Sequence, residues 1–247
     1  MALAASGLAA AGQSSWVFSI TQSGRYFTNP LDGVNWRTRV ARGETGWPDA
    51  SPALLDIEGA ALPALKYTPP PERPGGGPRR TYYFRTTCGA ANAPCATALT
   101  FSNLIDDGAI FHLNGAEIRR AGMDNTNSAC SSLAGRTVSD AATSGIFSIT
   151  GNLLTNLVTG DNVLAVEVHQ VTPTSTDIVF GTAVIASTTV SVTRGPYLQS
   201  GSHSNVTVRW RTDAGVNGRV RFGTNQANLD PFADEDARPN DHEVTLT

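Results

Sequence analysis

The chain has 247 residues, enough for one large β domain or two smaller ones. Its formal net charge of −3 and its charged fraction of 16% exclude a surface built to bind nucleic acid or an anionic membrane. Glycine and proline interrupt the sequence so often that long helices are excluded too, which favours an all-β sandwich of many short strands.

Residues 1–15 open with small and apolar side chains and lack the basic start of a signal peptide. They are also too short to cross a bilayer. We interpret them as the end of a secretion signal or as a linker from an upstream module, and the sequence leaves both alternatives open. No later apolar run approaches membrane length, so we expect a soluble protein without a membrane partner.

The first strand is predicted at residues 16–20, followed by an irregular region that contains Trp36 and Trp47. Tryptophans in loops rich in glycine and proline either close the end of a sandwich core or form a platform on which sugars stack. The first of these two interpretations is favoured. Residues 68–78 are rich in proline and glycine and predict a surface loop rather than a central strand.

The stretch 98–120 is the centre of the predicted antiparallel sheet. It follows a strand predicted at 80–87, which is rich in β-branched and aromatic residues. Two short apolar runs flank Asp106-Asp107-Gly108, and the turn Asn114-Gly115 follows. Both Asp-Gly and Asn-Gly accept positive φ at low cost, so the pattern predicts strand, tight turn, strand, tight turn, strand.

Three cysteines are present: Cys88, Cys95 and Cys130. Cys88 and Cys95 enclose a turn-forming loop, and we expect a disulfide to close it, which would indicate an oxidising compartment. The alternative is three unpaired small hydrophobic residues. Metal binding by these cysteines is not expected, because no C-x-x-C pattern or neighbouring histidine accompanies them.

Residues 121–144 are polar and without a clear period, which predicts a long loop at one end of the sandwich. A short strand at 146–149 and one helical turn at 153–157, capped by Asn152, are expected next. The run 163–169 predicts a strand on which Glu167 and His169 share one face. They form either a hydrogen-bonded structural pair, which we favour, or an acid–base or metal site.

A strand at 177–185 closes the first predicted domain, which spans 16–186. Residues 191–247 then form a second unit whose strands alternate apolar and polar positions, as in a sandwich with wet outer faces. About 57 residues are fewer than an immunoglobulin-like sandwich needs, so we expect this second domain to be incomplete in this chain.

The first domain resembles the galactose-binding-like jelly rolls of large secreted bacterial proteins. The resemblance rests on TYYFR at 81–85, DDGAIFHLNGAEIR at 106–119, GDNVLAVEVHQ at 160–170 and STD at 175–177. It implies a jelly-roll fold that binds glycans in some proteins and only braces a neighbour in others. The candidate contacts to such a glycan are Asp107, Arg119, His169 and Gln170, and Asp106 is a candidate ligand for a structural calcium ion.

The second unit is similar to the N-terminal fibronectin type III-like domain of purple acid phosphatases. TRGPYLQ at 193–199, NVTVRWRT at 205–212, GRVRFG at 218–223 and HEVTL at 242–246 carry this similarity. It implies a downstream metallophosphoesterase domain with a two-metal site, as the partner of this region. None of the ligand motifs of that domain occurs in this chain, so no catalytic residue and no cofactor is assigned to it.

Three functions follow as hypotheses. The leading one is a non-catalytic region of a secreted or periplasmic phosphoesterase that positions or targets the catalytic domain. The second is an autonomous carbohydrate-binding module, whose site would be formed by the loops from Asp106, from 121–144 and from Gln170–Thr176. These loops contain no tryptophan or tyrosine for stacking. The third, and least favoured, is an enzyme that uses Glu167 and His169.

Overall fold

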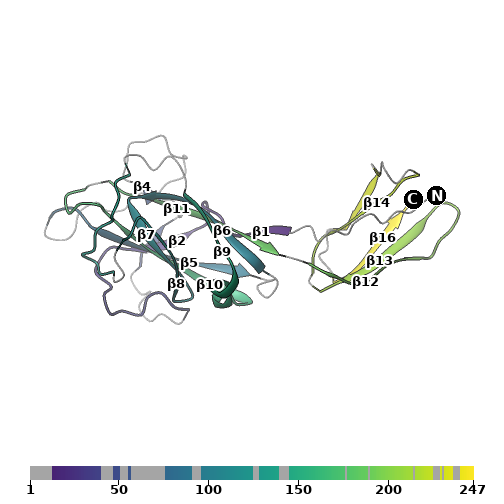
Figure 1. Ribbon diagram of the computed structural model, residues 1–247, viewed down its shortest axis with the longest axis horizontal. Coiled ribbons are helices and arrows are strands. Elements are labelled where there is room, and N and C mark those ends of the chain that lie inside the picture. The colour runs from purple at the N-terminus through teal and green to yellow at the C-terminus, as the bar shows by residue number, and fades with distance from the viewer. Residues whose placement is uncertain are drawn as a thin grey trace. The chain divides into compact units, whose positions relative to one another are not determined.

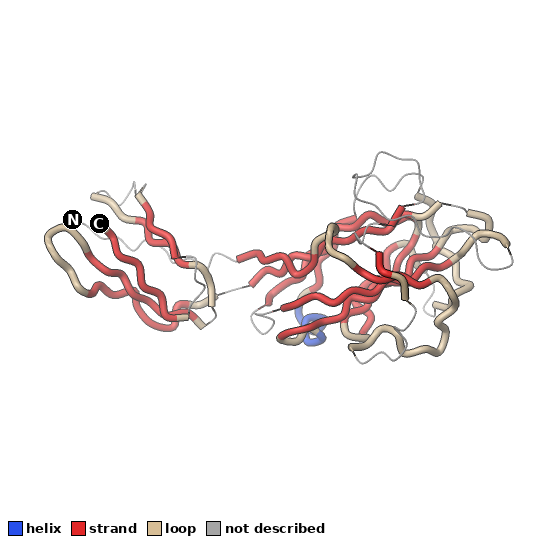
Figure 2. Tube along the Cα trace, turned by 180° about the vertical axis from the view of Figure 1, so that it is seen from behind, coloured by secondary structure: helices blue, strands red, loops and turns tan. Residues whose placement is uncertain are grey.

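The computed structural model describes residues 13–39, 47–50, 55–56, 76–90, 96–124, 128–138, 145–175, 177–188, 190–213, 215–224, 229, 231–235 and 240–247 (Figure 1). Within these residues the regular structure is almost entirely antiparallel strand, with one 3₁₀ helix, η2 (Gly151–Asn156), as Figure 2 shows. The predicted all-β sandwich is therefore confirmed. No helix in this part of the chain has the length and apolar character needed to cross a membrane.

The chain divides into two compact units, one made mainly of Ser15–Pro94 and Ala98–Ala186 and the other mainly of Ser187–Thr247. The larger unit contains two sheets. The five-stranded sheet has the order β1-β11-β6-β9, with β4 also paired to β11. Its strands are β1 (Gln13–Phe18), β4 (Leu55–Asp56), β6 (Ala96–Asp106), β9 (Gly145–Ile149) and β11 (Val179–Thr188).

The six-stranded sheet has the order β3-β2-β5-β10-β7-β8, which places β10 near its centre. Its strands are β2 (Gly24–Phe27), β3 (Asp49–Ala50), β5 (Thr81–Ala90), β7 (Gly108–Leu113), β8 (Ala116–Ala121) and β10 (Gly160–His169). The hairpin predicted at Asn114-Gly115 joins β7 to β8, and its two residues have φ of 52° and 97°. That turn needs positive φ at both positions, which asparagine and glycine tolerate best.

The hairpin predicted at Asp106-Asp107-Gly108 is wrong. The strands on its two sides, β6 and β7, belong to different sheets, so this turn is a corner between the sheets. Long-range bonds explain the difference: the two carboxylate oxygens of Asp107 accept the backbone N–H groups of Val138 and Val171, at 2.8 and 2.7 Å. These bonds connect the corner to two other segments, which a local turn signal does not reveal.

Aromatic side chains fill the space between the two sheets. Phe101 and Phe147 stack with ring centroids 4.6 Å apart, and Phe111 meets both rings edge-on. Phe84 from the six-stranded sheet stacks on Phe180 from the five-stranded sheet, also at 4.6 Å. Burying one such ring stabilises the fold by about 2–3 kcal/mol, so this cluster is a main source of stability.

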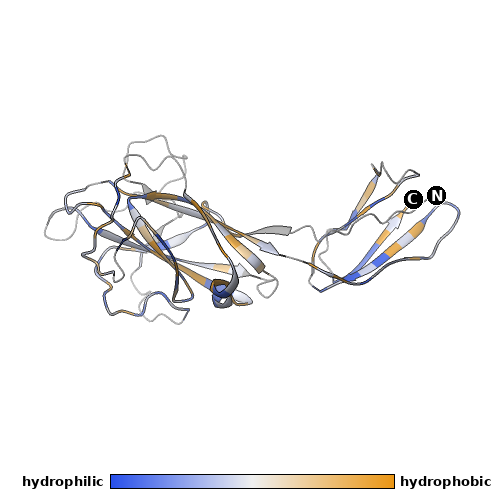
Figure 3. Cartoon of the chain, in the orientation of Figure 1, coloured by the Kyte–Doolittle hydropathy of each residue, from blue (hydrophilic) through white to orange (hydrophobic). Residues whose placement is uncertain are grey.

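The smaller unit has a three-stranded sheet, β12-β13-β16, and a two-stranded sheet, β14-β15. The strands are β12 (Val192–Gln199), β13 (Val206–Thr212), β14 (Gly218–Arg221), β15 (Phe232–Glu235) and β16 (Asp241–Leu246). Hydrophilic and hydrophobic bands follow one another along these strands (Figure 3). The buried cluster of Val208, Trp210, Val244 and Leu246 forms its core.

His242 joins the two sheets of this smaller unit. Its ring stacks on Trp210 at 4.5 Å with an interplanar angle of 2°. Its Nδ1 lies 2.7 Å from the Glu235 carboxylate of β15, and its Nε2 lies 3.0 Å from the Thr212 hydroxyl of β13. Gly218 permits this packing, because a Cβ at that position would lie 2.5 Å from the Trp210 ring.

Candidate functional site

The outer face of the six-stranded sheet, on the side away from the other sheet, is covered by two loop segments. Residues 28–38 and 128–138 make up this cover, which we call the loop layer. The sheet register places Tyr83, Glu167 and Ile110 side by side on this face. Trp36 of the loop layer meets Tyr83 edge-on at 5.1 Å, and Ile110 packs against Met123 and Ala134. The face is therefore a second, partly polar core.

Buried arginines fasten the first segment of the loop layer at both ends. Arg79 donates to the carbonyl of Thr28 at 2.9 Å, and Arg85 donates to the carbonyl of Thr38 at 2.8 Å. A hydrogen bond from a charged donor contributes more than one from a neutral donor. The segment between these two anchors is thus held onto β5 and the residues just before it.

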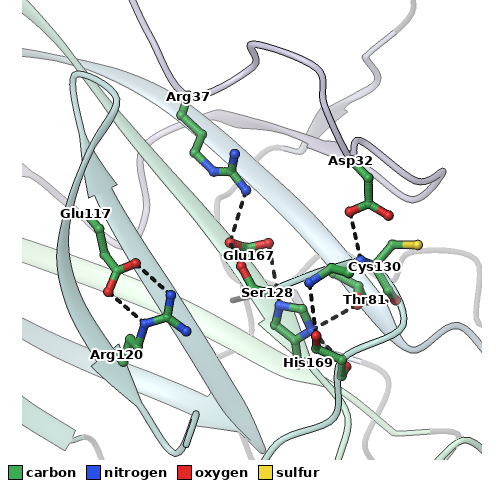
Figure 4. A network of polar contacts seen from close by, with 11 residues as sticks. Asp32, Arg37, Thr81, Glu117, Arg120, Ser128, Cys130, Glu167 and His169 are labelled. Atoms are coloured by element: carbon green, nitrogen blue, oxygen red, sulfur yellow. Dashed lines mark hydrogen bonds and ion pairs between the residues drawn. The ribbon is translucent and has the colours of Figure 1, made fainter. Parts of the chain in front are cut away.

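Glu167 of β10 is the carboxylate at the centre of the face, and only 2% of its surface is exposed. Arg37 donates to its Oε1 at 3.2 Å and Ser128 donates to the same oxygen at 3.0 Å, so it binds both segments of the loop layer (Figure 4). Burial alone would raise the pKa of Glu167, but the nearby His169 ring and the Arg37 guanidinium outweigh it and lower the pKa to about 2. Glu167 is therefore ionised across the physiological pH range.

His169 is fully buried, with a hydrogen-bonded Nδ1 and an Nε2 that faces the Glu167 carboxylate without a hydrogen bond in the described residues. Its Nδ1 lies 3.0 Å from the carbonyl of Ser132 and 3.0 Å from the hydroxyl of Thr81, and its Nε2 lies 3.5 Å from Glu167. Because a carbonyl only accepts, Nδ1 carries a hydrogen. The Thr81 hydroxyl in turn donates to the carbonyl of Cys130 at 2.9 Å.

Thr81, His169 and Glu167 thus form a chain of hydroxyl, imidazole and carboxylate, the set of groups that nucleophilic hydrolases use. The geometry does not suit that chemistry. The Thr81 hydroxyl is 4% exposed and donates its hydrogen to a carbonyl, so it does not face a substrate. The three groups instead connect β5 and β10 to the second segment of the loop layer.

His112 of β7 lies on the same face and is 6% exposed. The Trp36 ring meets it edge-on at 6.2 Å, and its Nδ1 has no hydrogen-bond partner in the part of the chain that the structure describes. Burial and the positive charge of Arg37 lower the pKa of His112 to about 4, so the ring is neutral near pH 7.

The structure brings three of the four predicted glycan contacts to one end of the larger unit. His169 pairs in register with Gly108, which follows Asp107, and Gln170 comes directly after His169. Gln170 is 1% exposed and donates from Nε2 to the carbonyl of Asp177. The carboxylate of Asp107 and the amide nitrogen of Gln170 are engaged within the protein, whereas Gln170 Oε1 and His169 Nε2 have no hydrogen-bond partner in the described residues.

The fourth predicted contact, Arg119, lies apart from the others. It pairs in register with Phe111, whose ring points between the sheets, and its guanidinium lies 5.5 Å from the centre of the Phe147 ring. His169 projects from the opposite face of the same sheet. One ligand therefore cannot contact both Arg119 and His169 in this structure.

Neither the candidate calcium site nor the predicted disulfide is established in the described residues. Asp106, the candidate calcium ligand, is 1% exposed, and no group of three His, Cys, Asp or Glu side chains in these residues could hold a metal ion. The predicted disulfide is not supported either. Cys88 is a free thiol buried in the fold, while Cys95 lies outside the described residues.

Trp36 and Trp47 are 3% and 8% exposed and belong to a buried cluster with Leu31 and Tyr83. They are not a sugar-stacking platform. The cluster covers the outer face of a sheet rather than the end of the sandwich.

Comparisons with known proteins give a loose structural likeness. No protein-family model matches the chain, and no curated protein matches it. The similar solved structures include apo β-glucuronidase from Ruminococcus gnavus, at 11% identity and a TM-score of 0.41 over 95% of this chain and 39% of that chain. A calcium-binding mutant of Bacteroides uniformis β-glucuronidase 2 matches at 12% identity and a TM-score of 0.42, over 95% and 28%. The chain thus spans well under half of these proteins, and at such TM-scores the likeness assigns no function.

Proposed function

We propose that this chain is a non-catalytic β-sandwich region that positions or targets a neighbouring domain of the same protein. The observation that carries the proposal is the state of its most reactive groups. Glu167 and His169 are 2% and 0% exposed, and their polar atoms hold the loop layer on the sheet instead of facing a cleft. A catalytic acid or base must reach the proton that it transfers, which burial under a fixed loop prevents.

The neighbouring domain is, in this proposal, a metal-dependent phosphoesterase of a protein that acts outside the cytoplasm. Support comes from the resemblance of residues 193–199 and 205–212 to the domain that precedes such enzymes. The two-metal site belongs to that domain and not to this chain, and phosphate esters are its proposed substrate class.

Two assays test this function. The chain alone should hydrolyse neither chromogenic phosphate monoesters nor chromogenic glycosides. Turnover that disappears in His169→Gln would overturn the proposal. Joined to the proposed phosphoesterase domain, the chain should raise that domain's melting temperature, and an unchanged melting temperature and activity would argue against a positioning role.

Carbohydrate binding is a second candidate function, favoured by Arg119. This side chain is exposed, and it lies over the partly exposed ring of Phe147, so a cation and an aromatic ring face solvent together. A glycan array, run with and without Ca²⁺, tests it. Binding that Arg119→Ala abolishes and the control Arg221→Ala preserves would make the chain a targeting module.

A further inference from the structure

The first segment of the loop layer makes two unlike contacts with the six-stranded sheet through consecutive residues. Trp36 covers the ring of His112, a group that gains a proton in acid. Arg37 binds Glu167, whose pKa of about 2 leaves it ionised in all but strong acid. Acid therefore weakens the first contact long before it weakens the second.

Four charged groups face His112. Arg37 and Arg120 disfavour a second positive charge on the ring, whereas Glu167 and Glu117 favour it. Burial disfavours the charge most strongly. A protonated ring in this position is poorly solvated, and moving Trp36 away admits water to the ring and relieves that penalty. Arg37 and Glu167 stay in place, and their opposite charges act on the ring in both states.

The fixed points of the segment allow such a movement. Arg79 holds Thr28 and Arg85 holds Thr38 through bonds to backbone carbonyls, and an arginine keeps its charge at any pH of interest. Between these anchors the described backbone bonds are short-range, from Val34 to Leu31 and from Trp36 to Val34, at 3.0 and 3.1 Å. One long-range bond crosses this stretch, since the Asp32 carboxylate accepts the backbone N–H of Cys130 at 2.9 Å. The segment is therefore a flap with fixed ends, and its opening also breaks this bond.

We propose that residues 31–36 form an acid-released cover on the six-stranded sheet, held closed by the packing of Leu31 and Trp36 against Tyr83 and His112 and limited in its opening by the anchors at Arg37 and Thr28. When the cover opens, Tyr83 and the Trp36 indole become accessible. The protein then presents an aromatic surface in acid that it hides at neutral pH.

The sign and size of the effect follow from proton binding. The closed form binds a proton on His112 near pH 4, and the open form binds it near the ordinary value of 6.5, so acid favours opening. A difference of about 2.5 pH units corresponds to an increase of about a hundredfold in the opening equilibrium constant between pH 7 and pH 4.

Hydrogen–deuterium exchange of the whole chain, read by mass spectrometry at pH 7 and pH 4 and corrected for intrinsic exchange rates, tests the proposal. Peptides that contain residues 31–36 should lose protection by about a hundredfold at pH 4, while peptides from β10 keep theirs. His112→Gln, which cannot gain a proton, should remove most of this loss. His203→Gln, at an exposed position in the smaller unit, is the matched control and should behave like the wild type.

Three results would overturn the proposal. The cover could stay protected at pH 4 in the wild-type chain. It could open only together with β10, which would indicate general acid unfolding. It could also open equally in His112→Gln and in the wild type. If His112→Gln does not fold at pH 7, His112→Phe replaces it, because the phenyl ring keeps the contact with Trp36 and also takes no proton.

Discussion

Replacing Glu167 by glutamine tests the central structural claim, that a buried carboxylate holds the loop layer. The substitution keeps the size of the side chain and removes its charge. Arg37 and His169, whose nitrogens lie 3.2 and 3.5 Å from the carboxylate, then face a neutral amide. Because one partner of a buried ion pair is left without its counter-charge, a loss of about 3–5 kcal/mol is typical of such a change.

The pKa of Glu167 gives a second route to the magnitude. Burial on its own would raise this pKa, yet His169 and Arg37 lower it from 4.5 to about 2. At about 1.4 kcal/mol per pH unit, the ionised carboxylate stabilises the folded state by about 3 kcal/mol. Since the folded-state pKa is depressed, this stability is present above pH 4.5 and is lost as the pH falls from 4.5 towards 2.

Hydrogen exchange of the full chain in increasing urea measures this free energy at β10. We expect Glu167→Gln to lower the opening free energy of β10 by about 3 kcal/mol at pH 7 and to abolish its dependence on pH between 4.5 and 2. Glu117→Gln is the control, because Glu117 is 41% exposed and pairs with Arg120 on the surface, where a pair contributes less than about 1 kcal/mol. A loss in Glu167→Gln no larger than in the control would refute the reasoning.

Three other predictions concern packing and the cysteines. Gly108→Ala should lower the free energy of unfolding, measured by thermal denaturation, by about 1–3 kcal/mol, because its Cβ would lie 2.7 Å from the sulfur of Met123. Gly145→Ala is the control and should be nearly neutral, since no atom lies within 4 Å of its Cβ. Equal effects of the two substitutions would contradict this account. His242→Gln should loosen the smaller unit and raise the exchange of its strands by at least tenfold, and unchanged exchange would show that the ring does not join the sheets. Burial raises the pKa of the Cys88 thiol to about 11, so iodoacetamide at pH 8 should label it only after unfolding without reductant, and a failure to label it even then would restore the predicted disulfide.

Short sequence motifs predicted those parts of the fold that depend only on the conformation of neighbouring residues. The Asn114-Gly115 turn needs positive φ at two neighbouring residues, and that requirement is visible in the sequence itself. The Asp106-Gly108 turn carries the same kind of signal but forms a corner between sheets, because Asp107 binds the backbone of residues 31 and 64 positions away. A turn motif predicts that the chain reverses or bends. Contacts with residues far along the chain determine which strands then pair.

The candidate site was also predicted only in part from local sequence patterns. Period-two alternation alone placed Glu167 and His169 on one face of a strand, and the structure agrees. Arg37 and Ser128 were missed, since they lie 130 and 39 residues from Glu167 and neither is part of a motif. One local feature pointed to Arg37: it follows Trp36, a large apolar residue that is expected to be buried, so its own side chain lies close to the buried face.

The face of β10 that carries Glu167 and His169 explains how loops without regular structure are held in one place. Its other face, with Val166 and Val168, packs between the sheets, where apolar contacts tolerate small displacements. The bonds from Glu167 to Arg37 and Ser128 are directional, so they specify which residues of each segment meet the sheet. A buried ion pair adds little net stability over apolar packing, and its best-attested use is to fix a register. We infer that the polar face of β10 serves to hold Arg37 and Ser128, and with them one point of each segment of the loop layer, in a fixed position that the Glu167 carboxylate releases only in strong acid.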